Sequence, residues 1–366
     1  MKVLYLDLLS PPGHKNLNKI LVRLLKDLAL VDVSWEEGYI EDRSLLSTAG
    51  SFYPIPKIYY NFNSKIDYRI KNYNKIKWVL KNISIASYDV VFISSYETIS
   101  FALAWPKNLS NINTRVFILN HNNPDELGSS LKRKFFKRIP KYVEHIVFEE
   151  YMKDYLLNDI KISNRVWVIH HPIDLSKVHD STYLHKNDDL ESKGGKLIFA
   201  PSGSNDEDFI ARLVDLQRNE KFLDDTQFVL LIKSKQTNYK DSHLIVTKKY
   251  FSYQEYISYL DKAYLILLPY PQSFRYRISG VLFDAFAFKK KIIATSIPLF
   301  RYFVEKYPFT GKVFNDVQEF KEIVYFYDKQ VENGTFENNV SFEEVWNTYS
   351  VDSVREEVRR MLEGER

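Results

Sequence analysis

Cationic and hydroxyl-bearing side chains gather just before a predicted helix in the last third of the chain. A loop that carries Arg275, Tyr276 and Arg277 leads through Ser279 and Gly280 into an amphipathic helix. The first N–H groups of a helix have no partner within the helix, and the helix dipole favours negative charge at that end. Glycine lets a ligand approach the backbone closely, and arginine can donate two parallel hydrogen bonds to one anion. The segment therefore predicts an anion site, with a diphosphate as the expected ligand.

A carboxylate follows on the same predicted helix. Asp284 lies four residues after Gly280, so the two positions share a helix face, and its oxygens can accept hydrogen bonds from sugar hydroxyls. The apolar run at residues 292–294 then predicts a buried strand. An ordinary loop, helix and strand with solvated arginines would also fit this pattern. We favour the anion site because two arginines, the serine-glycine helix start and the carboxylate all fall within ten residues.

The run FDAFAFKKKIIAT at residues 283–295 resembles the donor-binding signature of GT-B glycosyltransferases, especially family 4 (group 1), which read EAMA-x-GKPVIAT there. That family carries two glutamates eight positions apart. The first typically reaches the transferred sugar, and the second holds the ribose of the nucleotide. Asp284 stands at the second glutamate and Tyr276 at the first, so the resemblance implies ribose binding by Asp284 and carries no sugar contact over to Tyr276.

The resemblance is strongest over residues 263–301, fair over residues 196–261 and the last helix, and mainly topological in the first half. It implies an enzyme that uses a nucleotide diphosphate sugar as donor substrate without an obligatory metal or other cofactor. In such a site, cations and a helix N-terminus stabilise the departing diphosphate. The sequence agrees in having no aspartate pair directly after an apolar strand, since its Asp-Asp pairs at 188–189 and 224–225 lie in polar segments.

Further donor-binding candidates follow the expected strands of the second half, because open parallel sheets bind ligands at the carboxyl ends of their strands. Ser202 and Gly203 could donate to a phosphate, Lys233 could supply a charge, and Tyr250 or Phe251 could stack on a base. Tyr270 opens the arginine-bearing loop. Taken singly, Lys233 could equally be a surface lysine and Phe251 a core aromatic. The predicted donor-binding set is Gly13, Ser202, Gly203, Lys233, Phe251, Tyr270, Arg275, Tyr276, Arg277, Ser279, Gly280 and Asp284.

In the first half, the apolar run at residues 115–119 leads into His121, at a place that resembles the strand-ending histidine of family 4. Gly13, after the first strand, matches the family's glycine-rich loop more loosely. An inverting reaction would need a base that deprotonates the acceptor, for which the sequence offers Asp7, Glu97, His121, Asp125 and Glu126. A retaining reaction would need none, and His121 would then position the sugar. We take His121, Asp125 and Glu97 as the catalytic candidates.

These residues sit in a chain that alternates apolar runs with amphipathic segments. Strands are expected at residues 3–9, 90–94, 115–120, 146–148, 166–169, 196–200, 228–232, 243–246, 263–269 and 291–295. Helices are expected at residues 17–30, 98–105, 127–139, 151–157, 252–261 and 341–362, and residues 39–67 are expected to be irregular. The alternation predicts an α/β fold of GT-B type, with two Rossmann-like domains facing across a cleft. We expect an acceptor-side domain at residues 1–172, a nucleotide-sugar domain at 173–345 and a helix at 346–366 that packs back on the first domain.

Composition excludes several classes of protein. The chain has 366 residues and no cysteine, so it forms no disulfide and no thiolate metal site. Its net charge of +4 is too small to predict nucleic-acid binding. No run of apolar residues is long enough to span a bilayer, and the first apolar run is too short for a secretion signal. We therefore expect a cytoplasmic protein.

One basic cluster stands out, at residues 131–141. It contains Lys132, Arg133, Lys134, Phe135, Phe136, Lys137 and Arg138. Such a cluster could lie against anionic lipid headgroups, with its aromatic side chains at the interface. It could equally be a solvated helix face with two core phenylalanines. Because many related transferases use lipid-linked acceptors, we expect peripheral contact with the inner face of the cell membrane.

Three hypotheses for function remain. The first is a hexosyltransferase-type glycosyltransferase that moves a sugar from a nucleotide diphosphate sugar to a polysaccharide or lipid-linked glycan. A nucleotide-sugar 2-epimerase shares this fold and a diphosphate site, but would convert its donor without an acceptor. An inactive transferase-like partner subunit is the third, and is favoured by Tyr276 in place of a glutamate.

Overall fold

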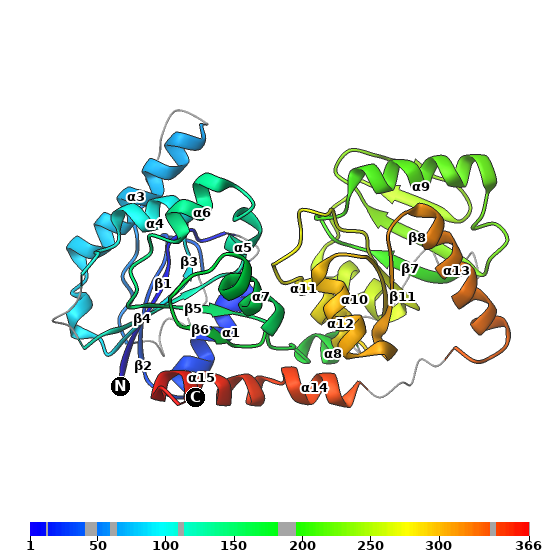
Figure 1. The fold of residues 1–366 in the computed structure, drawn as a ribbon. Helices are drawn as coiled ribbons and strands as arrows, with labels where there is room; N and C mark the ends of the chain where they lie inside the picture. The colour runs from blue at the N-terminus through cyan, green and yellow to red at the C-terminus, as the bar shows by residue number, and fades with distance from the viewer. Residues whose placement is uncertain are drawn as a thin grey trace. The chain divides into compact units, whose positions relative to one another are not determined.

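The computed structural model describes residues 1–11, 14–40, 50–58, 64–108, 113–181, 195–336 and 342–365 (Figure 1). The chain divides into two compact units. The first unit comprises Met1–His171, Tyr276–Ile278 and Val351–Arg366. The second comprises Pro172–Arg275 and Ser279–Ser350.

The first unit is built on a six-stranded sheet in which all paired strands run parallel, in the order β2-β1-β3-β4-β5-β6. Helices cover both faces of this sheet (Figure 1), and its strands are therefore apolar along most of their length instead of alternating with polar residues. The strands are Lys2–Asp7 (β1), Leu30–Ser34 (β2), Val90–Ser95 (β3), Arg115–Leu119 (β4), Val143–Val147 (β5) and Val166–Val168 (β6).

The helices of the first unit begin at recognisable capping residues. At the start of α3, the Ser64 hydroxyl accepts a hydrogen bond from the Asp67 N–H, and the Asp67 carboxylate accepts one from the Ser64 N–H. The α-helices are Lys15–Lys26 (α1), Lys65–Asn82 (α3), Thr98–Ala104 (α4), Asn123–Glu126 (α5), Ser130–Phe136 (α6), Glu150–Asp154 (α7) and Val351–Glu363 (α15), and Tyr155–Asp159 forms a π-helical turn, η3.

The second unit contains a seven-stranded sheet in the order β13-β12-β11-β7-β8-β10-β9. Its strands pair in parallel except for β9, which runs antiparallel to β10. The strands are Lys196–Ala200 (β7), Phe228–Lys233 (β8), Tyr239–Lys240 (β9), Leu244–Thr247 (β10), Leu265–Leu268 (β11), Lys291–Thr295 (β12) and Gly311–Phe314 (β13). The helices are Ser176–Ser181 (α8), Glu207–Glu220 (α9), Tyr253–Lys262 (α10), Gly280–Ala287 (α11), Pro298–Lys306 (α12), Val317–Glu332 (α13) and Glu343–Tyr349 (α14).

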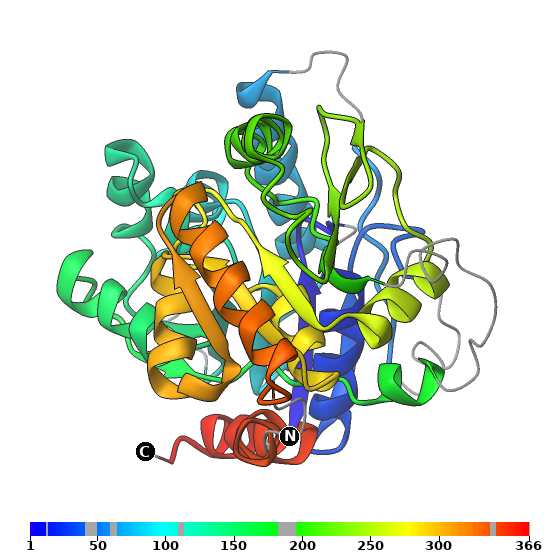
Figure 2. The same ribbon diagram turned by 90° about the vertical axis from the view of Figure 1, so that its right-hand side faces the viewer.

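Alternate residues of β7 face opposite sides of this sheet, as the two-residue period of a strand requires. Ile198 and Ala200 join a core with apolar residues of α9 and α13, and Figure 2 shows α13 lying over the strands. Phe199 points to the other side, where its ring contacts Tyr256 and Tyr259 of α10 at centroid distances of 6.4 and 5.3 Å. The second unit is thus three layers, with the sheet between two sets of helices.

The order of strands reverses between β7 and β11 in the second unit. From β7 the chain adds β8 and β10 on one side, and then β11, β12 and β13 on the other. The carboxyl ends of β7 and β11 are therefore the place where open α/β sheets bind ligands.

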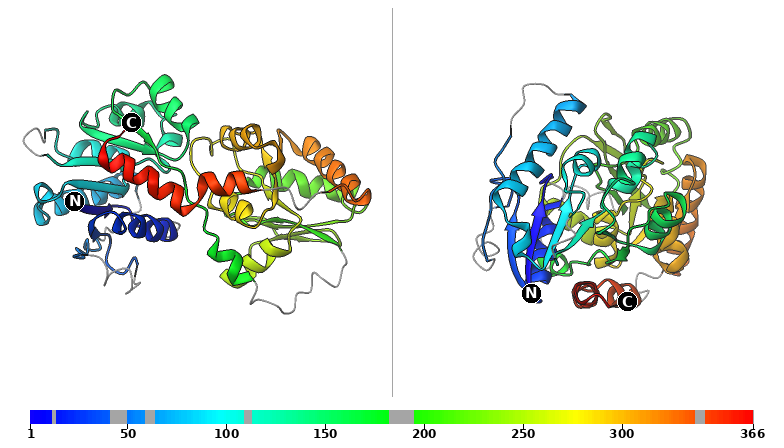
Figure 3. Two further views of the ribbon diagram at one scale, coloured as in Figure 1. Left: turned by 90° about the horizontal axis from the view of Figure 1, so that it is seen from below. Right: turned by 60° about the vertical axis from the view of Figure 1, so that its left-hand side comes forward.

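Helix α15 completes the first unit by packing beside α1 (Figure 3). The guanidinium of Arg115 joins this helix to the sheet. It donates hydrogen bonds to the carbonyl oxygens of Met361 (2.9 Å) and Leu362 (3.0 Å) and makes a two-pronged pair with Glu144. The last carbonyls of a helix have no partner within the helix. This arginine gives a partner to the Leu362 carbonyl and a second one to the Met361 carbonyl, which also accepts from the Gly364 N–H at 3.2 Å.

The predicted α/β fold with two parallel sheets is confirmed, but several elements were not foreseen. Strand β2 and helix α3 lie in stretches to which the sequence assigned no strand or helix, and α3 begins within the stretch expected to be irregular. Its buried positions include Asn72 and Lys75 beside Ile76 and Val79, so its apolar pattern is weak. The helix expected at residues 127–139 is shorter than predicted, because only Ser130–Phe136 (α6) is helical in that range. The expected last helix is two helices, with α14 in the second unit and α15 in the first.

We predict that Arg115→Met loosens α15. The variant loses two hydrogen bonds from a charged donor to α15 and the two-pronged pair with Glu144, so the free energy of unfolding should fall by about 2 kcal/mol or more. Urea unfolding measures the change, and hydrogen exchange should be faster in the amides of α15 than in those of α9. Arg212→Met, on the exposed side of α9, is the matched control. Unchanged exchange in α15 would contradict this role of Arg115.

Candidate functional site

Three buried residues bring their hydroxyl groups together at the carboxyl ends of β7 and β11. Tyr270 follows β11, and its hydroxyl hydrogen-bonds to the hydroxyl of Ser279 at 2.9 Å. The Ser202 hydroxyl, after β7, is a further hydrogen-bond partner of Tyr270. Thr295 holds Tyr270 in place, since its hydroxyl donates to the Tyr270 carbonyl (2.8 Å) and accepts from the Tyr270 N–H (3.1 Å). The loops after β7 and β11 are therefore joined to the start of α11.

The start of α11 is open beside this cluster. Ser279 caps the helix by accepting a hydrogen bond from the Leu282 N–H at 3.3 Å. A Cβ atom added at Gly280 or at Gly203 would meet no other atom within 4 Å, and neither residue has a positive φ. Packing and backbone conformation therefore do not require glycine at these positions. Both glycines border space that a ligand could enter.

A cavity of about 200 Å³ adjoins the carboxyl ends of β7 and β8. It contains both an aromatic wall and a cation, and is lined by Pro201, Gly203, Lys233, Tyr250, Phe251, Tyr253 and Tyr256. The rings of Tyr250 and Tyr253 are largely exposed, at 78% and 52%. Phe251 rests edge-on against the buried ring of Phe199 at 5.3 Å. Stacking on such rings suits a planar base.

Lys233 is held within the wall of this cavity. Its ammonium donates hydrogen bonds to the carbonyl oxygens of Ser234 (3.1 Å) and Lys248, and it lies 4.0 Å from the centre of the Tyr250 ring. Burial lowers the pKa of Lys233 from its ordinary value. Its contacts fix the loop that carries Tyr250, so the structure gives Lys233 a role in shaping the cavity.

Asp284 lies on α11 and is paired through both of its oxygens. Oδ1 accepts a hydrogen bond from the Lys177 ammonium at 2.6 Å, and Oδ2 accepts one from the Tyr256 hydroxyl at 2.6 Å. Burial and the Asp284 charge raise the pKa of Tyr256, so this hydroxyl stays protonated and acts as a donor. The sequence suggested neither Lys177 nor Tyr256 as a site residue.

The arginine-bearing loop is divided between the two units. Arg275 ends the second unit's stretch, and its Nε–H donates to the carbonyl oxygen of Gln272 at 2.9 Å. Tyr276 and Arg277 belong to the first unit. There the Asp125 carboxylate pairs with the Arg277 guanidinium and accepts a hydrogen bond from the Tyr276 N–H at 2.5 Å. The Tyr276 ring stacks on Tyr155 of η3, with centroids 3.7 Å apart.

The other carboxylates proposed as bases also have structural contacts. Glu97 caps α4, where it accepts hydrogen bonds from the N–H and the hydroxyl of Ser100 at 2.7 and 2.6 Å. Asp7 is fully buried at the end of β1 and accepts hydrogen bonds from the N–H groups of Leu9 and Ser10. These contacts explain both carboxylates without a catalytic role. Gly13 lies outside the described residues.

Histidines gather at the carboxyl ends of the strands in the first unit. The ring centres of His14 and His121 lie 4.2 Å apart, and Phe148 lies 5.5 Å from His121 and 5.6 Å from His171. Burial and His171 lower the pKa of His14 to about 4. Burial, His14 and Arg277 lower the pKa of His121 to about 3. Both rings are therefore neutral near pH 7. His121 can donate through Nδ1 to the Asn122 side chain (2.8 Å), which leaves Nε2 as an acceptor.

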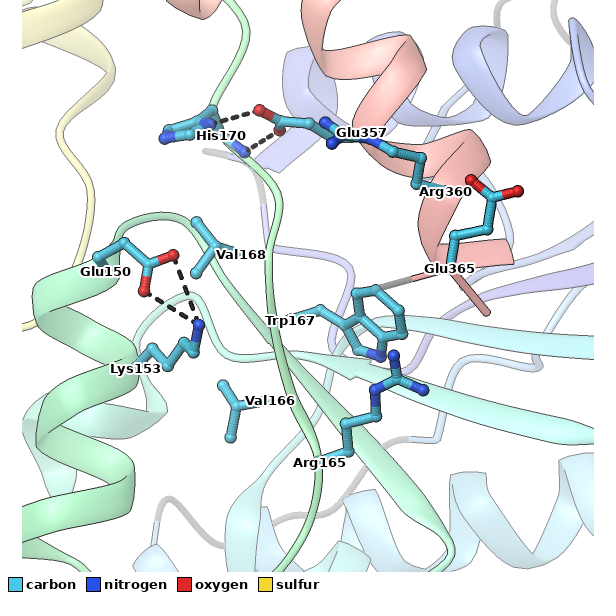
Figure 4. Close-up of a pocket in the computed structure, with 10 residues that line it drawn as sticks. All are labelled: Glu150, Lys153, Arg165, Val166, Trp167, Val168, His170, Glu357, Arg360 and Glu365. Carbon is cyan, nitrogen blue, oxygen red and sulfur yellow. Dashed lines mark hydrogen bonds and ion pairs between the residues drawn. The ribbon is translucent and has the colours of Figure 1, made fainter. Parts of the chain in front are cut away.

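A second cavity, of about 650 Å³, lies in the first unit along the edge strand β6 (Figure 4). Its lining mixes both signs of charge: Glu150, Lys153, Arg165, Val166, Trp167, Val168, His170, Glu357, Arg360 and Glu365. His170 Nδ1 lies 2.6 Å from Glu357 Oε1, and Lys153 pairs with Glu150. None of the site residues predicted from sequence lines this cavity.

The predicted membrane cluster falls on α6 and the turn after it. Arg133, Lys134, Lys137 and Arg138 are exposed, but Phe136 is buried and Phe135 is half-buried. Phe136 therefore belongs to the core, as expected if the cluster is a solvated helix face. Of the four cations, Arg133 also donates through Nε to the Leu127 carbonyl oxygen.

Two searches of the described residues gave negative results. No group of three or more histidine or acidic side chains in the described ranges could hold a metal ion. None of the helices in this part of the chain combines the length and the apolar character that crossing a bilayer requires.

Comparisons with known proteins bear on the fold. No family model matches the chain, and no curated relative matches it. Among solved structures, the chain is similar over all of its length to sucrose-phosphate synthase from Thermosynechococcus elongatus (TM-score 0.70, 11% identity, 99% of that chain). It is also similar to Anabaena Alr3699/HepE in complex with UDP (TM-score 0.66, 13% identity, 100% of both chains).

A UDP-N-acetylglucosamine 2-epimerase is similar as well, with a TM-score of 0.55 and 13% identity over 100% of this chain and 96% of that one. At such low identity these similarities establish the fold, which is the two-sheet α/β architecture of GT-B proteins.

We predict that the histidine cluster makes stability depend on pH. The pKa of His14 is about 4 in the folded state and about 6.5 in an unfolded chain, so the unfolded state binds an extra proton between these values. Stability should therefore fall as the pH drops from 6.5 towards 4. His14→Gln should reduce this slope by up to about 1.4 kcal/mol per pH unit.

Thermal unfolding followed from pH 7.5 to 4.5 measures the effect. At pH 7.5 His14 is neutral in both states, so any difference between the proteins there reports packing alone. Parallel curves for the two proteins at lower pH would contradict the prediction.

Proposed function

We propose that this protein is a glycosyltransferase that transfers a sugar from a nucleotide diphosphate sugar to a hydroxyl of a glycan acceptor. The observation that carries the proposal is the set of features at the carboxyl ends of β7, β8 and β11, namely an open helix start, two unobstructed glycines and an aromatic cavity. This set offers a place for a diphosphate and another for a base. The solved structure of HepE, which has the same fold, contains UDP.

In the proposed reaction, the bond between the anomeric carbon and the diphosphate oxygen breaks, and a bond from that carbon to an acceptor oxygen forms. The acceptor hydroxyl loses its proton, and the diphosphate leaves with the bonding electrons. Negative charge therefore grows on the phosphate as the bond breaks. The N-terminus of α11 at Ser279 and Gly280 is suited to stabilise this charge. The mechanism proposed here uses no bound metal or other cofactor.

The aromatic cavity is the proposed binding site of the nucleotide base. Tyr250, Phe251 and Tyr253 present their rings there, and the Asp284 carboxylate lies close by through its contact with Tyr256. A carboxylate oxygen has more than one acceptor site, so Asp284 can accept hydrogen bonds from ribose hydroxyls while it keeps its present partners. This arrangement supports the ribose role that the sequence resemblance implied.

We assign His121 to positioning. A base with a pKa of about 3 removes a hydroxyl proton poorly near pH 7, because general bases work best when their pKa lies near the working pH. Its neutral Nε2 can still accept a hydrogen bond from a sugar hydroxyl. Asp125 remains a candidate base if Arg277 leaves it.

The similarity to the 2-epimerase supports a second candidate function, a nucleotide-sugar 2-epimerase. A transferase and an epimerase would bind the same class of nucleotide sugar. They differ in the product, since an epimerase converts the nucleotide sugar without an acceptor. Release of nucleoside diphosphate only when a glycan acceptor is added supports the transferase, and a new nucleotide sugar in the absence of acceptor supports the epimerase.

We also propose that the first unit touches an anionic membrane surface. Helix α3 packs on α4, and α4 packs on α6. Together they expose Ile66, Ile70, Leu103 and Leu131, whose exposed fractions lie between 43% and 65%. The exposed cations of the basic cluster lie on α6, one of these three helices, and on the turn that follows it. Apolar side chains with basic neighbours suit a lipid interface, so a lipid-linked acceptor at the inner face of the cell membrane fits this surface.

The donor site is tested by Gly280→Ala. Since an added Cβ meets no protein atom, the variant should fold with unchanged or slightly higher stability. A diphosphate that lies against the helix start would clash with the methyl group, so we expect affinity for the preferred nucleotide sugar to fall at least ~10-fold. Calorimetry measures binding, and release of nucleoside diphosphate measures activity.

Gly128→Ala is the matched control, because Gly128 has equally open surroundings but lies in the first unit. It should leave nucleotide binding unchanged. Wild-type protein that binds no UDP-, GDP- or dTDP-sugar would refute the proposed function. Equal affinity of the Gly280→Ala and wild-type proteins would refute the placement of the diphosphate.

Membrane contact is tested with vesicles. Each cation near an anionic bilayer contributes about 1 kcal/mol, so reversing Lys134 and Lys137 to glutamate should reduce sedimentation with phosphatidylglycerol vesicles by ~10-fold or more. Lys329→Glu, on the exposed side of α13, is the control. Equal binding to phosphatidylcholine and phosphatidylglycerol vesicles would contradict an electrostatic contact.

A further inference from the structure

We propose that Lys177 of helix α8 is a further donor-binding residue that supplies the cation for the diphosphate. The inference rests on the proposed function and extends it to a residue that neither the anion motif nor the donor signature contains. Lys177 comes from a helix more than a hundred positions before α11 in the sequence.

The geometry places the Lys177 ammonium beside α11. Its Nζ lies 2.6 Å from Asp284 Oδ1. Asp284 follows Gly280 by four residues on the same helix, a rise of about 6 Å along the axis. A diphosphate at the start of α11 would therefore lie about one helical turn from the ammonium. The side chain of Lys177 is 14% exposed, so the charge is partly shielded from water and acts more strongly than a surface lysine would.

The cations that the sequence suggested for this task have other partners. Lys233 donates to two backbone carbonyls and lies against Tyr250. Arg277 pairs with Asp125 in the first unit. The loop after β7, from Pro201 to Asp206, contains no lysine or arginine at all. Arg275 donates through Nε to the Gln272 carbonyl oxygen. A further charge at the diphosphate can come from α8, which packs against α10, one wall of the aromatic cavity.

Lys177 and Asp284 can divide the recognition of one nucleotide between them. An ammonium has three N–H donors, and Asp284 takes one. The others can reach phosphate oxygens, while Asp284 accepts hydrogen bonds from the ribose. Tyr256 fixes the far oxygen of the carboxylate, so the pair keeps its orientation when a ligand arrives. The ion pair would thus present a positive end to phosphate and a negative end to sugar.

The test compares ligands with and without phosphate. Calorimetry measures the affinity of wild-type protein and of Lys177→Met for uridine and UDP, and for the guanosine and thymidine pairs. We expect the variant to bind the preferred nucleoside diphosphate at least ~10-fold more weakly and the matching nucleoside as well as wild type does. Lys177→Arg should retain most of the affinity, and Lys329→Met, at an exposed position, should retain all of it.

A lysine that only holds Asp284 in place would give another pattern, with nucleoside and diphosphate affinities falling equally. That result would overturn the proposal, as would unchanged diphosphate affinity. If Lys177→Met folds poorly because Asp284 loses its partner, the double variant Lys177→Met/Asp284→Asn removes that unpaired charge. Nucleoside and diphosphate affinities can then be compared in the double variant. In the double variant, the ratio of diphosphate to nucleoside affinity should still fall. A wild-type protein that binds none of the diphosphates would refute the proposed function and this assignment together.

Discussion

The reversal of strand order between β7 and β11 is the constraint on which the rest of the second unit depends. A parallel sheet covered on both faces has no place for unpaired polar groups among its strands, so these groups collect where the strands end. Where the order reverses, Ser202, Tyr270 and Ser279 meet in a buried cluster beside the open start of α11. The candidate site follows from topology before any single side chain is considered.

The charges beside α11 and the aromatic cavity already have partners. Lys177 pairs with Asp284, and Lys233 donates to backbone carbonyls. A ligand must therefore share or replace existing partners, and its affinity is the difference between two sets of contacts. Sharing costs less than replacement, because no buried charge loses its partner. This favours Asp284 and Lys177 as the first groups to meet a nucleotide, since a carboxylate and an ammonium can each take more than one hydrogen-bond partner.

Much of this fold could be predicted from sequence because its strands are short apolar runs, and residues 196–200 and 291–295 were identified as strands in full. Helix α3 could not be predicted, because a helix that buries Asn72 and Lys75 shows little apolar periodicity. Within the site, the start of α11 could be predicted because Ser279, Gly280 and Asp284 are close together in the chain. The partner of Asp284 could not be predicted, because Lys177 lies 107 positions away and residue spacing does not indicate such a distant contact.

Glycine at position 280 is costly unless something other than folding requires it. A glycine within a helix is less favourable than alanine by roughly 0.5–1 kcal/mol, because it loses more backbone freedom on folding. That cost is offset where a positive φ or a close neighbour excludes a side chain, as at Gly311, where a Cβ would meet the Ile292 carbonyl at 2.0 Å. Neither reason holds at Gly280. Open surroundings do not by themselves identify a ligand, since Gly128 is equally open. Gly280 differs in being the first residue of α11, where the unpaired N–H groups make an anion the ligand with most to gain from a close approach.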